Sequence, residues 1–380
     1  MNLLINNGLL SPLFFRTRGK LLQDFRQCGC QITLTGMQNE CDELIQQSGV
    51  KYHYMRVSHS GINPFADLSL LMIYIQYYRK NNIDIIYSYT PKPNIYGSLA
   101  AGIVGMKRVF PTVNGLGRAF VENDKFKARM IREITCLLYK MAFLFAEKVF
   151  FQNQDDRDEL IRRGVLKEEK CLVVSGSGID LDSFPYHPLQ KGNPVFLIAT
   201  RLLISKGVRE FCKAAELVKA KHPNAVFKVA GKLESGIDSF PESELQLFIN
   251  KGIVQYLGYI EDMKTALEEC TVFVFPSYYR EGVPHVLLEA MSSGRAIVTC
   301  DSPGCRETIR DPDKFGRGRN GFLIPPRDYE KLAERMLWMI DHKHDVNKMG
   351  IEGRKYAEEK FDVNIVNSVI LKEMGLLEGN

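Results

Sequence analysis

Short apolar runs alternate with longer segments whose apolar positions recur at helical spacing, and this pattern fills most of the chain. In the first half the short runs predict strands at 3–6, 31–35, 52–56, 83–89, 108–113 and 148–152. The segments between them predict helices at 14–28, 68–80, 94–104 and about 125–145. Strands that alternate with helices predict a parallel sheet covered on both faces.

The pattern restarts after residues 175–193, which are rich in Gly, Ser and Pro and are typical of a linker. Strands are predicted at 195–200, 226–230, 254–257, 272–275 and 296–299, with helices at 208–221, 263–269, 286–293 and from 329 onward. The fold class is therefore α/β, with two doubly wound Rossmann-like domains facing a cleft and ligands at the carboxyl ends of the strands. We place the first domain at 1–185 and the second at 186–360.

Composition narrows the class of protein. The chain has 380 residues, of which 45% are hydrophobic and 25% charged, as in soluble globular proteins of more than one domain. The nine cysteines are scattered without ligand spacing, which indicates reduced thiols in the cytoplasm. The N-terminus lacks the features of a signal peptide, and no run of about 18 apolar residues occurs. We therefore expect a cytoplasmic protein.

Charge is unevenly distributed. Residues 1–150 hold 18 Lys and Arg against 10 Asp and Glu, whereas the remainder holds 32 against 35. A basic first half suits an anionic partner such as a lipid surface, a diphosphate or a nucleic acid. A solvated face without a partner is the alternative.

The segment around residues 275–289 carries the most specific chemistry. A buried strand is predicted to end at Phe275, and Pro284 suits the first turn of the next helix because its missing N–H needs no acceptor there. The free N–H groups at that helix start form a place for a phosphate. Glu281 precedes the helix and Glu289 lies inside it, so one carboxylate can face a sugar and the other a ribose.

Arg201 and Lys206 follow the first strand of the second domain. At the carboxyl end of a central strand, two cations suit a diphosphate. The alternative is a surface Arg and Lys beside a helix start.

These residues carry a resemblance to a known family. The pattern Pro-Ser-x3-Glu-Gly-x-Pro-x4-Glu-Ala-Met beginning at Pro276, and Arg-x4-Lys-Gly beginning at Arg201, resemble the two donor-site signatures of the retaining glycosyltransferases of family 4 (group 1), which have the GT-B fold. The resemblance implies that residues 361–380 form a helix returning to the first domain, which would bind the acceptor. It implies a hexosyltransferase that moves a hexose or N-acetylhexosamine from a nucleotide-diphosphate sugar, with UDP suggested by the family alone. The acceptor would be a polyprenyl-diphosphate-linked sugar or an oligosaccharide in bacterial surface polysaccharide assembly, as for O-antigen.

The resemblance also assigns roles in the donor site. Arg201 and Lys206 would hold the diphosphate, Glu281 a sugar hydroxyl, and Glu289 the ribose hydroxyls. Further donor contacts would come from Gly282, Val283, Pro284, His285, Gly231, Tyr259 and Ile260. A plain surface turn is the alternative for Gly231. The resemblance implies no metal site, no divalent metal and no other cofactor.

Candidates on the acceptor side lie in the first domain. They are Asn7, Gly8, Lys92, Asn114 and Gly115, each placed just after a predicted strand. Many family members carry a histidine near the position of Asn114, and its absence here puts a histidine-based role in doubt. A tight turn at Gly115 and a solvated Lys92 are the alternatives.

Basic and apolar residues mix at helical spacing in 125–141. With Arg16, Arg18 and Lys20, this segment predicts peripheral docking of the first domain on the inner face of the plasma membrane. The alternative is a core helix with a basic outer face.

Two other functions remain open at this level. A sugar-nucleotide 2-epimerase of the same fold would need more acid–base groups than the single histidine, His285, in the site. A non-catalytic membrane-surface binding protein would explain the basic half but not the two donor signatures. Nucleic acid is not an expected partner, because no aromatic–basic RNA motif is present.

Overall fold

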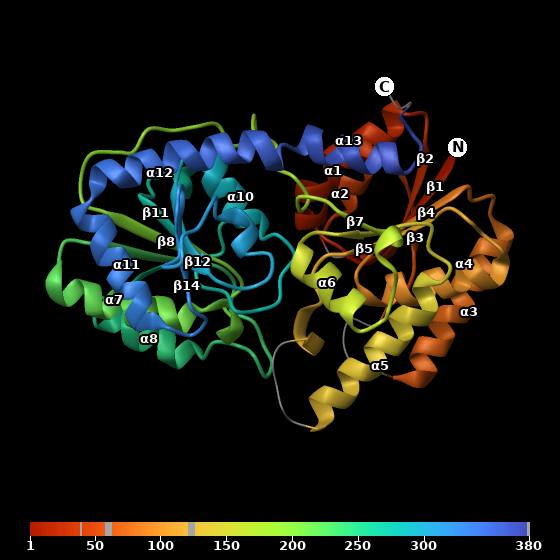
Figure 1. Cartoon of the computed structure of the whole chain (residues 1–380), viewed down its shortest axis with the longest axis horizontal. Helices are drawn as coiled ribbons and strands as arrows, with labels where there is room; N and C mark the ends of the chain where they lie inside the picture. Colours follow the sequence, from red (N-terminus) through yellow and green to blue (C-terminus); the bar gives the residue numbers. More distant parts are fainter. Residues whose placement is uncertain (39, 58–62, 121–125, 378–380) are drawn as a thin grey trace. The chain divides into compact units, whose positions relative to one another are not determined.

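The computed structural model describes residues 1–38, 40–57, 63–120 and 126–377. The chain divides into two compact units, shown in Figure 1. Unit 1 contains residues 1–178 together with 363–380, and unit 2 contains residues 179–362. Over the described ranges, no helix is both long enough and apolar enough to cross a bilayer.

Unit 1 is built on a seven-stranded parallel sheet with the order β3-β2-β1-β4-β5-β6-β7. Its strands are β1 Asn2–Leu10, β2 Gln31–Gln38, β3 Lys51–Tyr54, β4 Ile85–Tyr89, β5 Val109–Val113, β6 Val149–Phe151 and β7 Cys171–Val173. Its helices are α1 Pro12–Gln27, α2 Asp42–Ser48, α3 Pro64–Lys80, η1 Pro93–Gly97, α4 Ser98–Val104, η2 Gly117–Phe120, α5 Phe126–Phe143, α6 Gln154–Arg162, η3 Glu168–Lys170 and α13 Val363–Glu373.

The central strands of this sheet are buried on both faces, which explains why β4, β5 and β6 read as largely apolar runs. Along β1, Leu3 and Ile5 pack into a core under α1, α2 and α13, whereas Leu4 points into the core under α3 and α4. The C-terminal helix α13 contributes Val366 and Ile370 to the first of these cores. The return of the last helix to the first domain, implied by the family resemblance, is therefore observed.

Unit 2 has the strand order β10-β9-β8-β11-β12-β14-β13. Its first five strands repeat the order of the first five strands of unit 1, and β13 is an antiparallel strand at its border. Its strands are β8 Val195–Ala199, β9 Val226–Ala230, β10 Gln255–Gly258, β11 Val272–Phe275, β12 Ala296–Cys300, β13 Arg317–Gly318 and β14 Gly321–Ile324. Its helices are η4 Ile204–Lys206, α7 Val208–Lys221, α8 Glu242–Asn250, α9 Met263–Glu268, α10 His285–Ser292, η5 Arg306–Thr308, α11 Tyr329–Asp341, α12 Lys343–Tyr356 and η6 Ala357–Phe361.

The observed units differ from the sequence-based boundaries by a few residues. We placed the first boundary after residue 185, but unit 2 already begins at Ile179. The reason is that Arg354 of unit 2 holds this stretch, since its Nη1 donates to the carbonyls of Leu181 at 3.3 Å and Phe184 at 2.9 Å. The second boundary falls after Asp362 rather than after residue 360.

Candidate donor site in unit 2

The loop after β8 carries the two predicted cations. Arg201 is exposed, and its side chain makes no ion pair or hydrogen bond with the part of the chain that the structure describes. Lys206 ends the short helix η4 and is only 7% exposed. Gly207 then turns the chain into α7 with a φ of 77°, and a Cβ at this position would lie 2.2 Å from the carbonyl oxygen of Pro276. The loop after β8 therefore presses against the loop after β11.

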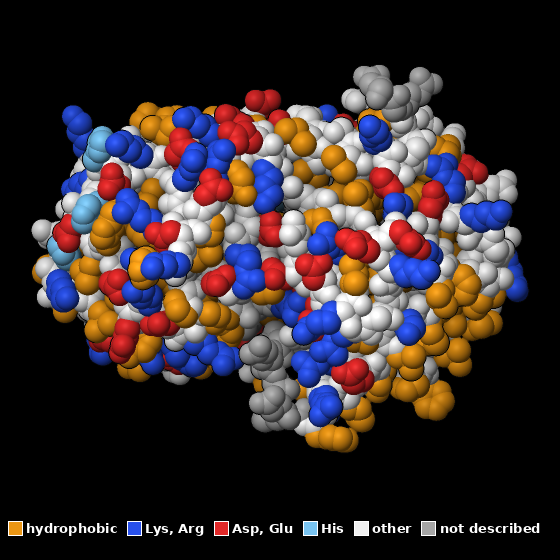
Figure 2. Space-filling view, in the orientation of Figure 1, with side chains coloured by type: hydrophobic (Ala, Val, Ile, Leu, Met, Phe, Trp, Pro, Cys, Tyr) orange, Lys and Arg blue, Asp and Glu red, His pale blue; other side chains and the backbone are white. Residues whose placement is uncertain are grey.

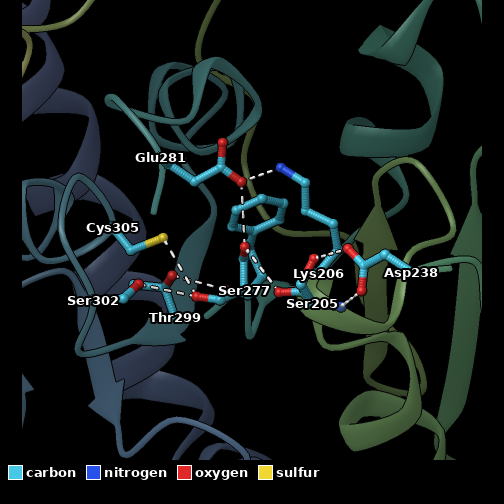
Figure 3. A network of polar contacts seen from close by, with 9 residues as sticks. Ser205, Lys206, Asp238, Ser277, Glu281, Thr299, Ser302 and Cys305 are labelled. Carbon is cyan, nitrogen blue, oxygen red and sulfur yellow. Dashed lines mark hydrogen bonds and ion pairs between the residues drawn. The ribbon is translucent and has the colours of Figure 1, made fainter. Parts of the chain in front are cut away.

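Lys206 and Glu281 form an ion pair between these two loops (Figure 3). Their side chains are 9% and 17% exposed. The Ser277 hydroxyl donates to the same Glu281 oxygen at 3.2 Å, and the Lys206 ammonium lies 5.2 Å from the centroid of the Tyr279 ring. The structure thus brings together two of the residues predicted for the donor site, in a partly buried position where their charges are weakly screened.

Ser205 braces the same pair of loops. Its carbonyl accepts the N–H groups of Tyr278 and Tyr279 at 3.0 and 3.1 Å. Asp238 accepts the Ser205 N–H at 3.2 Å and also the Ser205 hydroxyl, as Figure 3 shows. Sequence reasoning missed Ser205 and Asp238. Ser205 lies within the Arg-x4-Lys-Gly element, but no pattern marks Asp238, which reaches the site only through the loop after β9.

The loop after β12 supports the donor loop from its other side. The Ser302 hydroxyl donates to the carbonyl of Ser277 at 3.0 Å. Gly304 has a φ of 77°, and a Cβ there would lie 1.6 Å from the carbonyl oxygen of Gly282. The backbone of the Gly282 turn is therefore fixed by direct contact with a second backbone. Val283 and Pro284, which follow it, are buried.

Helix α10 begins at His285 and holds Glu289. We predicted Pro284 in the first turn of this helix; it is the N-cap residue, directly before that turn, because its ψ of 116° is extended. Glu289 is completely buried, and one of its carboxylate oxygens lies 3.0 Å from Nδ1 of His285, one helical turn earlier. Glutamate is almost never fully buried without a partner, because burying an unpaired charge is costly. Glu289 is therefore not an ordinary exposed carboxylate on the surface of a helix.

The predicted glycine turn after β9 adjoins Arg201 through the backbone. Gly231 has a φ of 144°, and a Cβ there would lie 1.7 Å from the carbonyl oxygen of Thr200. Its N–H donates to the carbonyl of Gly258 at 2.7 Å, and the Tyr256 hydroxyl donates to its carbonyl at 2.8 Å. Only glycine fits this position. Next to it, Tyr259 is 68% exposed and Ile260 is partly buried.

The acceptor-side candidates in unit 1 lie in or after three different strands. Strand β1 runs to Leu10, so Asn7 and Gly8 lie inside the strand, at an irregularity in its pairing with β2, and the loop predicted there is wrong. The Asn7 side chain forms a hydrogen bond within its own strand, because its Nδ2 donates to the carbonyl of Leu9 at 3.0 Å. The strand continues because the run Leu9-Leu10 is itself buried or half-buried.

Lys92 and Asn114 each have a partner. Lys92 Nζ lies 2.7 Å from Asp67, whose side chain is 7% exposed, so Lys92 is not the solvated lysine of the alternative interpretation. Asn114 follows β5 and accepts a hydrogen bond from Arg18 at 3.4 Å. Gly115 adopts a φ of 106°, which fits the tight turn that we weighed for it. Arg18 is 6% exposed, so its predicted place on a membrane-docking face is wrong. Arg18 instead lies on the face of α1 that packs against the sheet, beside Tyr89 of β4.

Among the described residues, no group of three or more His, Cys, Asp and Glu side chains is placed to hold a metal ion.

Comparison with known proteins now identifies the family. The model described as "Glycosyl transferases group 1" matches residues 182–356, and the model described as "Glycosyl transferase 4-like" matches residues 13–153. The N,N'-diacetylbacillosaminyl-diphospho-undecaprenol alpha-1,3-N-acetylgalactosaminyltransferase of Campylobacter jejuni is 31% identical over 351 residues, which are 88% of this chain and 88% of that protein. The capsular polysaccharide biosynthesis glycosyltransferase CapM of Staphylococcus aureus is 26% identical over 80% of this chain and 79% of its own.

Solved structures agree on the fold. HepE of Anabaena, in complex with UDP-glucose, superposes with a TM-score of 0.77 at 19% identity and covers 99% of this chain and 100% of its own. The sucrose-phosphate synthase of Thermosynechococcus elongatus gives a TM-score of 0.78 at 16% identity over 98% of each chain. The GT-B fold predicted from the sequence is confirmed.

The chain belongs to the group 1 glycosyltransferases, and it is a glycosyltransferase enzyme. The resemblance stated from the two donor signatures is thereby confirmed. Membership of this family favours glycosyl transfer over the epimerase and the non-catalytic binding protein that the sequence had left open.

Proposed function

We propose that the protein is a retaining, metal-independent hexosyltransferase. It takes a hexose or an N-acetylhexosamine from a UDP-sugar and transfers it to a polyprenyl-diphosphate-linked or oligosaccharide acceptor in bacterial surface polysaccharide assembly. The observation that carries the proposal is the Lys206–Glu281 ion pair between the loops that follow two neighbouring strands, β8 and β11, together with the buried Glu289 on α10.

The geometry suits a nucleoside diphosphate as leaving group. Breaking the sugar–phosphate bond places negative charge on the β-phosphate, and fixed cations stabilise it without reorganisation. Lys206 is held against Glu281 at the start of α7, and Arg201 projects from the same loop. These two cations would do what a divalent metal does in other transferases. Glu281 would bind a hydroxyl of the sugar, and Glu289 the ribose hydroxyls.

Relatives support the choice of donor and acceptor. HepE was solved with UDP-glucose, and a 26% identical Escherichia coli relative is named a UDP-Gal:alpha-D-GlcNAc-diphosphoundecaprenol alpha-1,3-galactosyltransferase. The Campylobacter jejuni relative likewise acts on a diphospho-undecaprenol-linked sugar according to its name. A uridine nucleotide and a lipid-linked diphosphate are accordingly the substrates we propose for this chain.

For retention, we propose that the acceptor hydroxyl attacks the face that the diphosphate leaves. The oxygen of the departing β-phosphate takes the hydroxyl proton, the new glycosidic bond forms, and the nucleoside diphosphate carries the proton away. The positions of Lys206 and Arg201 would keep the diphosphate close to this face.

Unit 1 offers a surface for peripheral membrane contact. On α5, Phe126, Met130 and Leu137 are 81%, 46% and 57% exposed and follow helical spacing, with exposed Lys127 and Lys140 nearby. Helix α3 adds an apolar stripe, formed by Phe65, Leu68 and Met72. Figure 2 shows hydrophobic side chains gathered over α3 and Lys and Arg side chains near α5. Apolar side chains mixed with cations suit an anionic bilayer surface, and we propose the cytoplasmic face of the plasma membrane as the location.

A thermal-shift screen of UDP-, GDP-, ADP- and TDP-sugars tests the donor site. UDP-sugars should raise the melting temperature of the wild type. Glu289→Gln and Arg201→Ala should abolish that shift and leave the melting temperature without ligand nearly unchanged. Arg319→Ala removes an exposed arginine elsewhere in unit 2 and should respond like the wild type. An unaltered ligand response in both donor-site variants contradicts the proposal.

Vesicle sedimentation tests the membrane surface. The wild type should co-sediment with phosphatidylglycerol vesicles and be released by salt, because part of the attraction is electrostatic. Phe65→Glu with Leu68→Glu should weaken sedimentation. Leu247→Glu, at a 61% exposed position on α8 of unit 2, is the matched control. Equal sedimentation of all variants refutes this surface.

A further inference from the structure

One buried cation of unit 1 has no role in the functions described above. Arg18 lies in the middle of α1 and is 6% exposed. Its guanidinium lies 4.8 Å from the centroid of the Tyr89 ring, and one of its nitrogens donates to Asn114 Oδ1 at 3.4 Å. Tyr89 ends β4 and Asn114 follows β5, so the guanidinium sits where the carboxyl ends of these two neighbouring strands meet.

The charge of Arg18 is not neutralised within the described part of unit 1. Arg18 forms no ion pair with any described carboxylate, whereas Lys20, half a turn further along α1, pairs with Asp24 at 2.8 Å. Lys92, the other cation that follows β4, pairs with Asp67 at 2.7 Å. A neutral ring and one amide oxygen are weak substitutes for a carboxylate. Burying a charge is costly unless it is paired, so an uncompensated buried guanidinium indicates an anionic ligand.

The guanidinium is nevertheless open to a ligand. Among the described residues, the only hydrogen-bond partner of the guanidinium is Asn114, which one nitrogen reaches. The other nitrogens of Arg18 do not belong to the fully buried side-chain atoms that lack a hydrogen-bond partner. Its remaining N–H groups therefore reach the surface. They do so at the carboxyl ends of the central strands, where ligands bind in doubly wound sheets.

We propose that Arg18, oriented by Asn114 and Tyr89, binds the diphosphate of the lipid-linked acceptor. This inference rests on the proposed function and names a group that recognises its acceptor. A guanidinium donates two parallel N–H groups to phosphate oxygens, and it remains charged when partly buried, which a lysine does less reliably. Asn114 thereby acts as a positioning residue, because its Oδ1 fixes the plane of the guanidinium.

Phosphate could also reach Arg18 from the donor nucleotide or from a phospholipid headgroup, so the experiment separates the three sources. Binding of farnesyl diphosphate to the full-length protein is measured by titration calorimetry in saturating UDP, which fills the donor site. Farnesol is the probe without phosphate, and dihexanoyl phosphatidylglycerol is the probe with a headgroup phosphate. UDP is titrated separately into each variant.

Arg18→Gln should weaken the binding of farnesyl diphosphate about 10- to 100-fold, which is the range expected for the loss of charge-assisted hydrogen bonds. Farnesol, phosphatidylglycerol and UDP should bind it as they bind the wild type. Arg18→Lys should lie between the two, since it keeps the charge but loses the paired geometry, and it serves as the test if Arg18→Gln does not fold. Arg26→Gln removes an exposed arginine from the same helix and should bind all four compounds normally.

Asn114→Ala should weaken the binding of farnesyl diphosphate by less than Arg18→Gln does. The double variant should bind this compound as weakly as Arg18→Gln alone. Undiminished farnesyl diphosphate binding in both Arg18 variants overturns the inference. So does a loss confined to UDP or to phosphatidylglycerol, which would assign Arg18 to the donor or to a headgroup. Failure of the wild type to bind UDP at all would instead count against the proposed function.

Discussion

The two units share the order of their first five strands, but charged side chains at the carboxyl ends of these strands are paired differently. In unit 2, Lys206 is paired with Glu281 inside a network that Ser205, Asp238 and Ser277 complete. In unit 1, the corresponding region holds Arg18, which has an aromatic ring and an amide as neighbours but pairs with no carboxylate of the described residues.

This difference separates what a fold supplies from what its residues supply. The doubly wound topology decides where loops gather, and it does so in the same way twice. The network of unit 2 fixes its loops before a ligand arrives, which is the arrangement that preorganised stabilisation requires. The cation of unit 1 is oriented but not neutralised, so an anion is needed to complete its surroundings.

The largest expected effect is the loss of the cation of unit 2. Lys206→Ala should lower kcat for glycosyl transfer by about 10²- to 10³-fold, because fixed charge on a leaving group typically contributes that much. Lys213→Ala, on the adjoining helix α7 where the side chain contacts the Tyr329 ring, should keep nearly full activity. A Lys206→Ala variant that retains more than a tenth of the wild-type kcat would remove the contrast between the units.

The next effect concerns the paired lysine of unit 1. Lys92→Met leaves the buried Asp67 carboxylate without its partner and should lower the free energy of unfolding by about 3 kcal/mol. The double variant Lys92→Met with Asp67→Asn should recover most of this loss, because no buried charge remains. Chemical denaturation of the single and double variants measures the coupling. Independent, additive losses would show that Lys92 is available for another role.

A backbone contact in unit 2 can be broken in isolation. Gly231→Ala should lower the free energy of unfolding by about 1–3 kcal/mol and weaken the binding of UDP. A Cβ would lie 1.7 Å from the Thr200 carbonyl oxygen, and the φ of 144° is unfavourable for alanine. Gly236→Ala, in the same loop, imposes a similar φ of 130° with no atom within 4 Å of the added Cβ. Melting temperatures of the two variants separate the contact from the φ strain. Equal losses would show that the contact contributes nothing.

The smallest effect sets a baseline away from both sites. Arg209 donates two hydrogen bonds to Glu244, at 2.7 and 2.6 Å, and these lower the pKa of the Glu244 carboxyl. Arg209→Gln should lower the free energy of unfolding by roughly 0.5 kcal/mol at pH 7, as is typical of pairs that remain partly exposed to solvent. Because the folded-state pKa of Glu244 lies below its unfolded value, the stabilisation is present above about pH 4.5 and is lost as the pH falls through the lowered pKa. Urea unfolding at pH 7 and pH 3 checks this, and a difference that persists at pH 3 contradicts it.

Much of the fold followed from local pattern. Runs such as 195–200 and 272–275 were predicted as strands because nearly every position is apolar. The structure explains this composition, since both faces of these strands are buried. Helices α2, α6 and α8 were not predicted, since they are short and their polar positions outnumber the apolar ones or interrupt the helical period. The end of β1 was misplaced because Asn6 and Asn7 are typical of a turn, yet Asn6 is buried and bonded to Tyr78 and Thr35.

The sequence by itself determined most of the order of elements and the two-domain fold, and it predicted the candidate donor-site residues. It could do so because spacing along one strand–loop–helix segment places these groups without reference to distant parts. Only the tertiary structure decided that Lys206 meets Glu281, that Asp238 braces Ser205 and that Arg18 is buried beside Asn114. Each of these contacts joins loops or helices that are far apart in the chain. Their charges become neighbours only after the sheets have packed, and no local pattern records which partners packing will bring together.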